Sequence, residues 1–134
     1  MKIALDVDGV LADVIQSWLN YNNAIRQTIT KSQISEWDFW KNFQINRYDF
    51  YNELSLCWKN WKSIPPTEEK LSSSINQLNT LGDVDIVTAR EESTNSYVKQ
   101  WLKSQHITYN EYVSVIDGPQ KSKLDYDIFI DNSP

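Results

Sequence analysis

The chain has few residues of the kinds that form covalent or zinc-bound cross-links. It contains one cysteine, Cys57, and one histidine, His106, among 134 residues. A single cysteine excludes an intrachain disulfide and is typical of a reducing compartment, so a cytoplasmic location is predicted. One cysteine and one histidine also exclude the usual zinc sites built from several such side chains.

Long hydrophobic runs are absent too, which bears on membranes. No apolar stretch approaches the ~20 residues that cross a bilayer, and Asp6 and Asp8 interrupt any signal-peptide core near the N-terminus. The formal net charge of −5 disfavours contact with duplex DNA or an anionic membrane. We therefore expect neither a membrane nor a duplex nucleic acid as a partner.

The chain has the composition of one globular domain, with 40% hydrophobic and 23% charged residues. Residues 2–7 are mostly apolar and contain no turn residue, which predicts a short buried strand. Asp6 and Asp8 lie two positions apart at its C-terminal end, so their side chains point the same way. Gly9 allows a sharp turn just after them. Two carboxylates this close repel each other, and a divalent cation or a shared proton would relieve the repulsion.

The second half of the chain alternates helical and strand patterns. Residues 65–69 open a helix whose buried stripe is predicted to be Leu71, Ile75, Leu78 and Leu81, with Gly82 as its stop. The later predicted elements are a strand at 83–88, a helix at 91–104, a strand at 112–116 and a strand at 126–131. This alternation is typical of an α/β fold with a parallel sheet.

Residues 14–64 form a connection far longer than is usual between a strand and a helix. The segment carries eleven of the seventeen aromatic residues, and Phe50, Leu54 and Trp58 follow helical spacing. We predict a small helical cap at 14–64 over an α/β core made of 1–13 and 65–134. Some rings must form the core of the cap, whereas others are candidates for stacking on a nucleobase.

Charge is unevenly spread along the chain. The segment 14–64 holds six basic and four acidic residues, a balance of +2, so the remainder carries −7. A mildly basic segment facing an acidic core suits a small phosphorylated substrate. An ordinary mixed surface explains the same distribution equally well.

The run Asp6-Val7-Asp8-Gly9-Val10 resembles the first motif of the haloacid dehalogenase superfamily of Mg²⁺-dependent phosphatases. Its longer form, DVDGVLAD, is most similar to the 5′(3′)-deoxyribonucleotidase branch. Thr88, the lysines at 121 and 123, and Asp131 follow in the superfamily's order, so the resemblance covers essentially the whole chain. It implies a Rossmann-like parallel sheet with the fourth strand beside the first and the second strand on the other side.

In such a sheet Asp6, Asp8, Thr88 and Asp131 would meet at one edge, and the resemblance implies a role for each. Asp6 is the expected nucleophile, and Asp8 is the expected general acid and base. Mg²⁺ is the expected cofactor, with Asp6, the main-chain carbonyl of Asp8, and Asp131 as its ligands. The expected substrate-binding residues are Thr88, Ala89, Arg90 and Lys121.

Several assignments have alternatives. Lys121, ten residues before Asp131, is favoured over Lys123 as the motif lysine. Arg90 either clamps the substrate or pairs with one of its neighbours, Glu91 or Glu92. Asp13 is as well suited to capping a helix as to chemistry.

Three functions fit this pattern. The first is a phosphatase for (deoxy)nucleoside monophosphates, and the second is one for sugar phosphates or nucleic-acid 3′-phosphate ends. The third is a shortened, inactive relative that only binds its ligand, because the chain has Asn132 where many relatives have a second Asp and stops where they continue. Either the sequence is truncated or a second copy covers the last strand in a homodimer. A dehalogenase is disfavoured, because halide displacement does not need Asp8.

Overall fold

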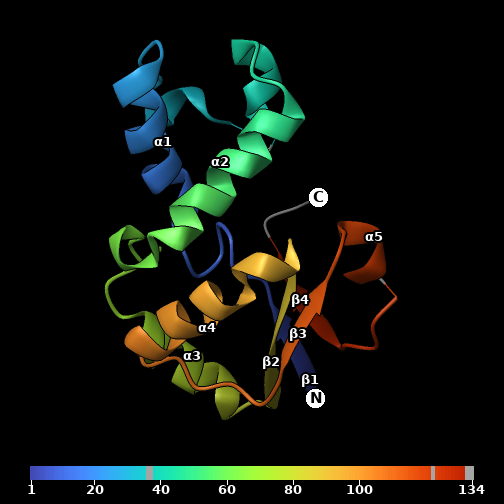
Figure 1. Cartoon of the computed structure of the whole chain (residues 1–134). Coiled ribbons are helices and arrows are strands. Elements are labelled where there is room, and N and C mark those ends of the chain that lie inside the picture. Colours follow the sequence, from blue (N-terminus) through green and yellow to red (C-terminus); the bar gives the residue numbers. More distant parts are fainter. Residues whose placement is uncertain (36–37, 122, 132–134) are drawn as a thin grey trace.

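The computed structural model describes residues 1–35, 38–121 and 123–131, and its centre is a four-stranded parallel sheet (Figure 1). The strand order is β3-β2-β1-β4, as the family resemblance implies. The strands are β1 Lys2–Leu5, β2 Asp83–Ala89, β3 Tyr112–Val115 and β4 Ile128–Ile130. The α-helices are α1 Val14–Ile25, α2 Arg47–Lys59, α3 Leu71–Asn79, α4 Asn95–Ser104 and α5 Gly118–Lys121. The 3₁₀ turns are η1 Lys31–Gln33, η2 Phe39–Phe43, η3 Trp61–Ser63 and η4 Glu92–Thr94.

Helices cover both faces of the sheet. In Figure 1, α3 and α4 lie on one side of the strands and α5 lies on the other. This arrangement follows from the strand order, because right-handed connections from β1 to β2 to β3 put their helices on one face, and the return to β4 crosses the other. The α/β prediction is confirmed. No helix of the described residues is long and apolar enough to span a membrane.

The first strand ends two residues earlier than predicted. The carbonyl of Val7 accepts the backbone N–H groups of Val10, Leu11 and Ala12, at 3.2, 2.9 and 3.0 Å. This compact turn, in which Gly9 has a φ of 79°, takes the chain out of the sheet after β1. The last strand is shorter as well and begins at Ile128 rather than at residue 126. Its three residues are all partly exposed, because β4 lies at the edge of the described sheet.

The helix predicted to open at residues 65–69 begins only at Leu71. The backbone before it is engaged elsewhere: Thr67 donates its N–H to the carbonyl of Leu11 at 2.9 Å, and Asp13 donates to that of Pro65 at 2.8 Å. The two connections between the sheet and the segment 14–64 are therefore hydrogen-bonded to each other. Likewise, the helix predicted at 91–104 starts as the turn η4 and becomes α-helical at Asn95.

The C-terminal end of α3 differs from the prediction as well. The helix ends at Asn79, so Gly82 is not its stop, and Leu81 is 66% exposed rather than buried. Gly82 has another reason to be a glycine. A Cβ at this position would lie 2.2 Å from the carbonyl oxygen of Met1, a separation that no real side chain tolerates.

The segment 14–64 has a core of its own made of aromatic rings. Trp18, Phe39 and Phe50 lie edge to face with centroids 5.3 Å apart, and Trp40 stacks on Phe50 at 4.5 Å. All four rings are buried. These four rings pack α1, η2 and α2 against one another. Ser35-Glu36-Trp37-Asp38 has the sequence pattern of a turn or a short helix start, and residues 36 and 37 of it lie outside the described residues.

Candidate active site

Asp6 and Asp131 follow adjacent strands and face the same ammonium group. The backbone N–H of Asp6 extends the β1–β4 ladder by donating to the carbonyl of Ile130 at 2.9 Å. Lys121, at the end of α5, places its Nζ 3.2 Å from Asp6 Oδ2 and 2.9 Å from Asp131 Oδ2. The lysine side chain is 9% exposed, and burying its charge is tolerable because two carboxylates neutralise it.

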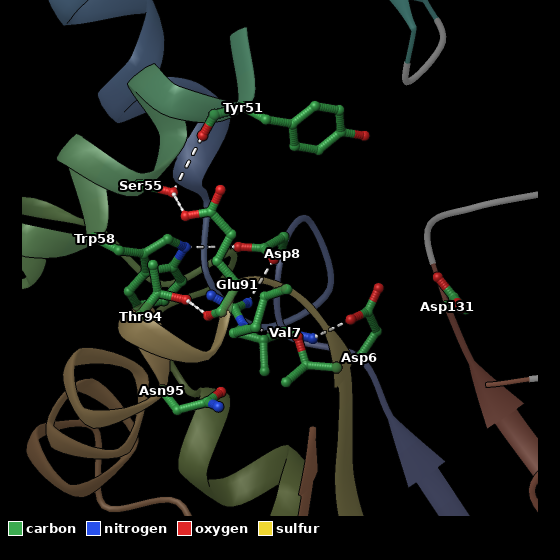
Figure 2. A network of polar contacts seen from close by, with 12 residues as sticks. Asp6, Val7, Asp8, Tyr51, Ser55, Trp58, Glu91, Thr94, Asn95 and Asp131 are labelled. Carbon is green, nitrogen blue, oxygen red and sulfur yellow. Dashed lines mark hydrogen bonds and ion pairs between the residues drawn. The ribbon is translucent and has the colours of Figure 1, made fainter. Parts of the chain in front are cut away.

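Burial changes the acidity of Asp6. The loss of solvent contact is the main cause that raises the pKa of its carboxyl to about 7, and the charge of Asp8 adds to the rise. The ammonium of Lys121 opposes this change without cancelling it. One oxygen of the carboxyl is held, because Oδ1 accepts the backbone N–H of Val7 at 2.8 Å (Figure 2). The other, Oδ2, faces Lys121.

Asp8 has a separate donor for each of its side-chain oxygens. Trp58, on α2, donates its Nε1–H to Oδ1 at 2.9 Å (Figure 2). Arg90, just after β2, places Nη2 2.5 Å from Oδ2. The guanidinium also donates from Nε to Thr88 Oγ1 at 3.0 Å, and it lies 5.0 Å from the centre of the Trp58 ring. Asp8, Arg90 and Trp58 thus form one connected group.

The ion pair of Arg90 differs from the one that its sequence neighbours suggest. The ion partner of Arg90 is Asp8, which follows a different strand, and not its neighbours Glu91 or Glu92 as the local sequence suggested. Thr88 is fully buried, and its hydroxyl oxygen already accepts a hydrogen bond from Arg90. Ala89 ends β2 and is half-buried. The substrate-binding roles predicted for these three residues stay predictions.

The face of α2 that carries Trp58 continues toward the outside of the site. Tyr51, Ser55 and Trp58 are spaced four and three residues apart, so they lie on one side of the helix. The hydroxyl of Ser55 donates to the carbonyl of Tyr51 at 3.2 Å and lies 3.5 Å from Glu91 Oε2 (Figure 2). Because Glu91 follows Arg90 directly, this helix face is placed against the strand ends of the core.

The family follows from comparison of the whole sequence. Residues 1–134 match the sequence profile of the family described as 5′ nucleotidase, deoxy (pyrimidine), cytosolic type C protein. The chain belongs to this family. Its members are, by that description, nucleotidases, and nucleotidases are phosphoric monoester hydrolases. The superfamily recognised in the motif at Asp6 is thereby confirmed.

Solved structures of similar fold come from two bacteria. A hydrolase from Streptococcus pneumoniae TIGR4 aligns with a TM-score of 0.51 and 15% identity, over 92% of this chain and 68% of that one. A haloacid dehalogenase superfamily hydrolase, subfamily IA, variant 1, from Geobacter sulfurreducens PCA gives a TM-score of 0.48 and 14% identity. That alignment covers 84% of this chain and 61% of the other, so the chain spans about three fifths of that relative's length. A search of curated proteins finds no significant match.

The donor set at the strand ends suits the Mg²⁺ that members of the nucleotidase superfamily use. No group of three or more His, Cys, Asp or Glu side chains is gathered closely enough to hold a metal ion by itself among the residues described. Two carboxylates, from Asp6 and Asp131, do converge on one cation, the ammonium of Lys121. The side chain of Asp8 is engaged by Trp58 and Arg90, and the family resemblance assigns the metal to its main-chain carbonyl instead. Carboxylate and carbonyl oxygens are the ligands that Mg²⁺ prefers.

The remaining sequence candidates lie in other places. Asp13 caps α1, accepting the N–H of Gln16 at 3.2 Å, and pairs with Lys31 at 2.5 Å. Lys123 is exposed, whereas Lys121 is buried between the two carboxylates. Asn132 lies outside the described residues.

A hollow of about 390 Å³ in the segment 14–64 lies among residues different from those of the predicted site. It is lined at the end of α1 and around η2, and Arg26 is the cationic residue among its described lining residues. The guanidinium of Arg26 is already neutralised by Glu53 at 2.6 Å. The described lining of this hollow therefore offers no unneutralised positive charge to a phosphate.

The residues that sequence reasoning missed are Trp58 as a partner of Asp8, and Glu91 with Ser55 at the contact between α2 and the core. The helical spacing of Trp58 predicted only that it is buried. A clue was available in its position seven residues before Pro65, where the chain must return to the sheet. That position alone does not say which acidic group the indole meets.

Proposed function

We propose that this chain is a Mg²⁺-dependent phosphatase that hydrolyses (deoxy)nucleoside monophosphates through an aspartyl-phosphate on Asp6. One observation carries the proposal: Asp6 and Asp131, at the ends of adjacent parallel strands, face Lys121 from two sides, and Asp8 lies beside them. Open α/β sheets bind ligands at this edge, beyond the carboxyl ends of the strands. The match to a nucleotidase family over all residues supports the same substrate class.

In the first step Asp6 Oδ2 attacks phosphorus, and the bond from phosphorus to the ester oxygen breaks. Asp8, in its protonated form, gives its proton to the departing alcohol oxygen. In the second step Asp8 takes a proton from water, the water oxygen attacks the phosphorus of the aspartyl-phosphate, and the bond to Asp6 Oδ2 breaks. Inorganic phosphate and the free Asp6 carboxylate result, so the cycle closes with one water consumed.

The charges of the site fit a dianionic substrate only when another cation is present. The carboxylates of Asp6, Asp8 and Asp131 face the two cations Lys121 and Arg90. A phosphate monoester adds further negative charge to this group. Mg²⁺ held by Asp6, Asp131 and the Asp8 carbonyl would neutralise charge on the transferring phosphoryl group, while Lys121 and Arg90 bind its oxygens.

Tyr51 is the ring we propose for the nucleobase. It is half-buried and lies one turn beyond Ser55 on the face of α2 that meets the core, whereas Trp18, Phe39, Trp40 and Phe50 are buried inside the helical segment. Substituting Tyr51→Ala should raise KM for nucleoside monophosphates about tenfold, in line with ~1–3 kcal/mol for stacking of one base. The control is Tyr48→Ala, because Tyr48 is on the same helix and 78% exposed.

The test of the function is a phosphate-release assay with and without Mg²⁺. The panel contains dUMP, dTMP, sugar phosphates and a 3′-phosphorylated oligonucleotide. We expect release from the nucleotides, its loss with EDTA, and its loss in Asp6→Asn. The matched control is Asp83→Asn, because Asp83 is an exposed acid at the opposite end of the sheet. Preference for sugar phosphates or oligonucleotide ends, or binding without turnover, would refute the nucleotide assignment.

The proposal includes two further expectations, the location of the protein and its oligomeric state. The cytoplasmic location rests on the single cysteine and on the family's description as cytosolic. A homodimer would cover β4, whose Ile128, Phe129 and Ile130 are 41%, 38% and 36% exposed. Sedimentation equilibrium distinguishes a monomer from a dimer.

A further inference from the structure

The acid and base Asp8 is held by two parts of the chain that are far apart in sequence. Arg90 belongs to the sheet, just after β2, and pairs with Oδ2 at 2.5 Å. Trp58 belongs to α2 and donates to Oδ1 at 2.9 Å, across a separation of 50 residues. The segment 14–64 therefore reaches the reacting group directly through one indole N–H, in addition to lying over the site.

The indole of Trp58 is itself held in place. Trp58 is 2% exposed, and its ring lies edge to face with Trp101 at a centroid distance of 6.1 Å. Trp101 is anchored in turn, because its Nε1–H donates to the carbonyl of Ile64 at 2.8 Å. The guanidinium of Arg90 lies 5.0 Å from the centre of the Trp58 ring. A ring fixed on several sides presents its N–H in a constant direction.

We propose that Trp58 is a positioning residue for Asp8, a proposal that rests on the proposed function. An indole N–H donates a hydrogen bond but does not exchange its proton with a carboxyl group under ordinary conditions. Trp58 therefore orients Asp8 without competing for the proton that Asp8 transfers. Because proton transfer depends on the direction of the donor, a freely rotating Asp8 would transfer its proton less often to the leaving oxygen.

The variant Trp58→Phe tests this role, because it keeps an aromatic ring against Trp101 and Arg90 and removes only the N–H. Loss of a hydrogen bond to a charged group costs enough to slow the step about 10- to 100-fold. We expect this loss in the first-turnover rate with the fastest nucleoside monophosphate of the panel, with KM within about threefold. A leaving group that departs without taking a proton does not depend on the orientation of Asp8. The first-turnover release of p-nitrophenol from p-nitrophenyl phosphate should therefore change less than about threefold.

The control is Trp18→Phe, which makes the same chemical change, the loss of an indole N–H bonded to a carboxylate, away from the strand ends. Trp18 is fully buried and donates to Glu53 Oε1 at 3.2 Å, so the stability of this variant should fall about as much as that of Trp58→Phe. Its first-turnover rates should stay near those of the wild type. Equal losses in the two variants, or equal losses with both substrates, would show that Trp58 is only part of the core and would overturn the proposal.

A second measurement does not depend on turnover. In ¹H–¹⁵N spectra the indole signal that is absent from Trp58→Phe should move in Asp8→Asn and stay in place in Asp83→Asn. No movement in Asp8→Asn would overturn the proposal while leaving the phosphatase assignment intact. If the wild-type chain releases no phosphate from any member of the panel, both the function and the positioning role are refuted.

Discussion

The same trio of side chains occurs twice in this molecule, in two different settings. Inside the segment 14–64, Glu53 accepts Arg26 at 2.6 Å on each oxygen and Trp18 Nε1 at 3.2 Å. At the strand ends, Asp8 accepts Arg90 and Trp58. Each set therefore joins one carboxylate, one guanidinium and one indole N–H.

What differs is how each carboxylate is enclosed. The guanidinium of Arg26 donates to both oxygens of Glu53, whose side chain is 8% exposed. This hydrogen bonding raises the pKa of Arg26 above its ordinary value. Asp8 has one donor per oxygen, is 19% exposed, and lies close enough to Asp6 for its charge to raise that pKa. We infer that the set around Glu53 joins α1 to α2. The set around Asp8, which is more exposed and lies at the strand ends, can exchange partners with a substrate.

The largest expected difference between the two sets is catalytic. Asp8→Asn should lower kcat by about 1,000-fold, within the range that general acid–base catalysis contributes. The same acid-to-amide change in the other set, Glu53→Gln, should leave kcat within about threefold. Steady-state assays of both variants on one nucleotide decide this, and a similar loss in both would erase the distinction.

The next effect concerns stability against pH. Asp6 has a pKa raised from 3.8 to about 7 in the folded protein, so between these values the folded state binds more protons than the unfolded state. Stability should therefore fall as pH rises toward 7, by about 3 kcal/mol between pH 5 and 8 at ~1.36 kcal/mol per pKa unit. Asp6→Asn should lack this fall.

Urea unfolding of both proteins in EDTA at pH 5 and pH 8 measures it. Glu53→Gln serves as the control, because Glu53 is remote from Asp6 and the pH dependence of the wild type should persist in it. Parallel pH dependence in Asp6→Asn and the wild type would contradict the burial cost assigned to Asp6.

A smaller effect separates the two candidate lysines. Lys121→Met should lower kcat/KM about 100-fold, because it removes a cation that pairs with Asp6 and Asp131 and is proposed to bind the phosphoryl oxygens. Lys123→Met should change kcat/KM less than about twofold, since Lys123 is exposed. A larger loss in Lys123→Met than in Lys121→Met would show that Lys123, and not Lys121, is the motif lysine.

The smallest expected effect is on stability, and here the two sets should be alike. Glu53→Gln removes the charge partner of Arg26, whose side chain is 33% exposed, and should lower the free energy of unfolding by about 2 kcal/mol. Asp8→Asn should cost about the same, because it leaves the guanidinium of Arg90, whose side chain is 5% exposed, without a charge partner but also removes the repulsion between Asp8 and Asp6. Urea titrations at pH 7 measure both losses, and no measurable loss in Glu53→Gln would contradict its structural role.

Sequence reasoning reached the sheet and its charged edge because both depend on local patterns. Apolar runs that end in acids placed Asp6 and Asp131 at strand ends, and the family order put those strands side by side. The spacing of ten residues singled out Lys121 without proving its contact. The predicted length of β1 and the predicted start of α3 were wrong. The carbonyls of Val7 and Leu11 accept hydrogen bonds from backbone N–H groups, and the periodicity of the sequence does not indicate these bonds.

Local sequence patterns could not predict the partners of Asp8. Arg90 has acids directly beside it in the sequence, yet it meets an acid 82 residues away because folding buries both groups together. Trp58 was one of eleven aromatic residues in its segment with the same helical pattern as its neighbours. Only the way in which α2 lies against the core separates the ring that touches Asp8 from those that pack inside.

By itself the sequence determined the α/β class, the strand order through the family motifs, and the acids that end β1 and β4. Tertiary structure alone decided which donor meets which oxygen, and so which Arg–carboxylate–Trp set lies at the strand ends where we propose the reaction. The physical reason is that side-chain periodicity follows from the backbone of one element. A hydrogen bond of 2.9 Å between Trp58 and Asp8 depends instead on how two elements dock, and this is set by the burial of many residues at once.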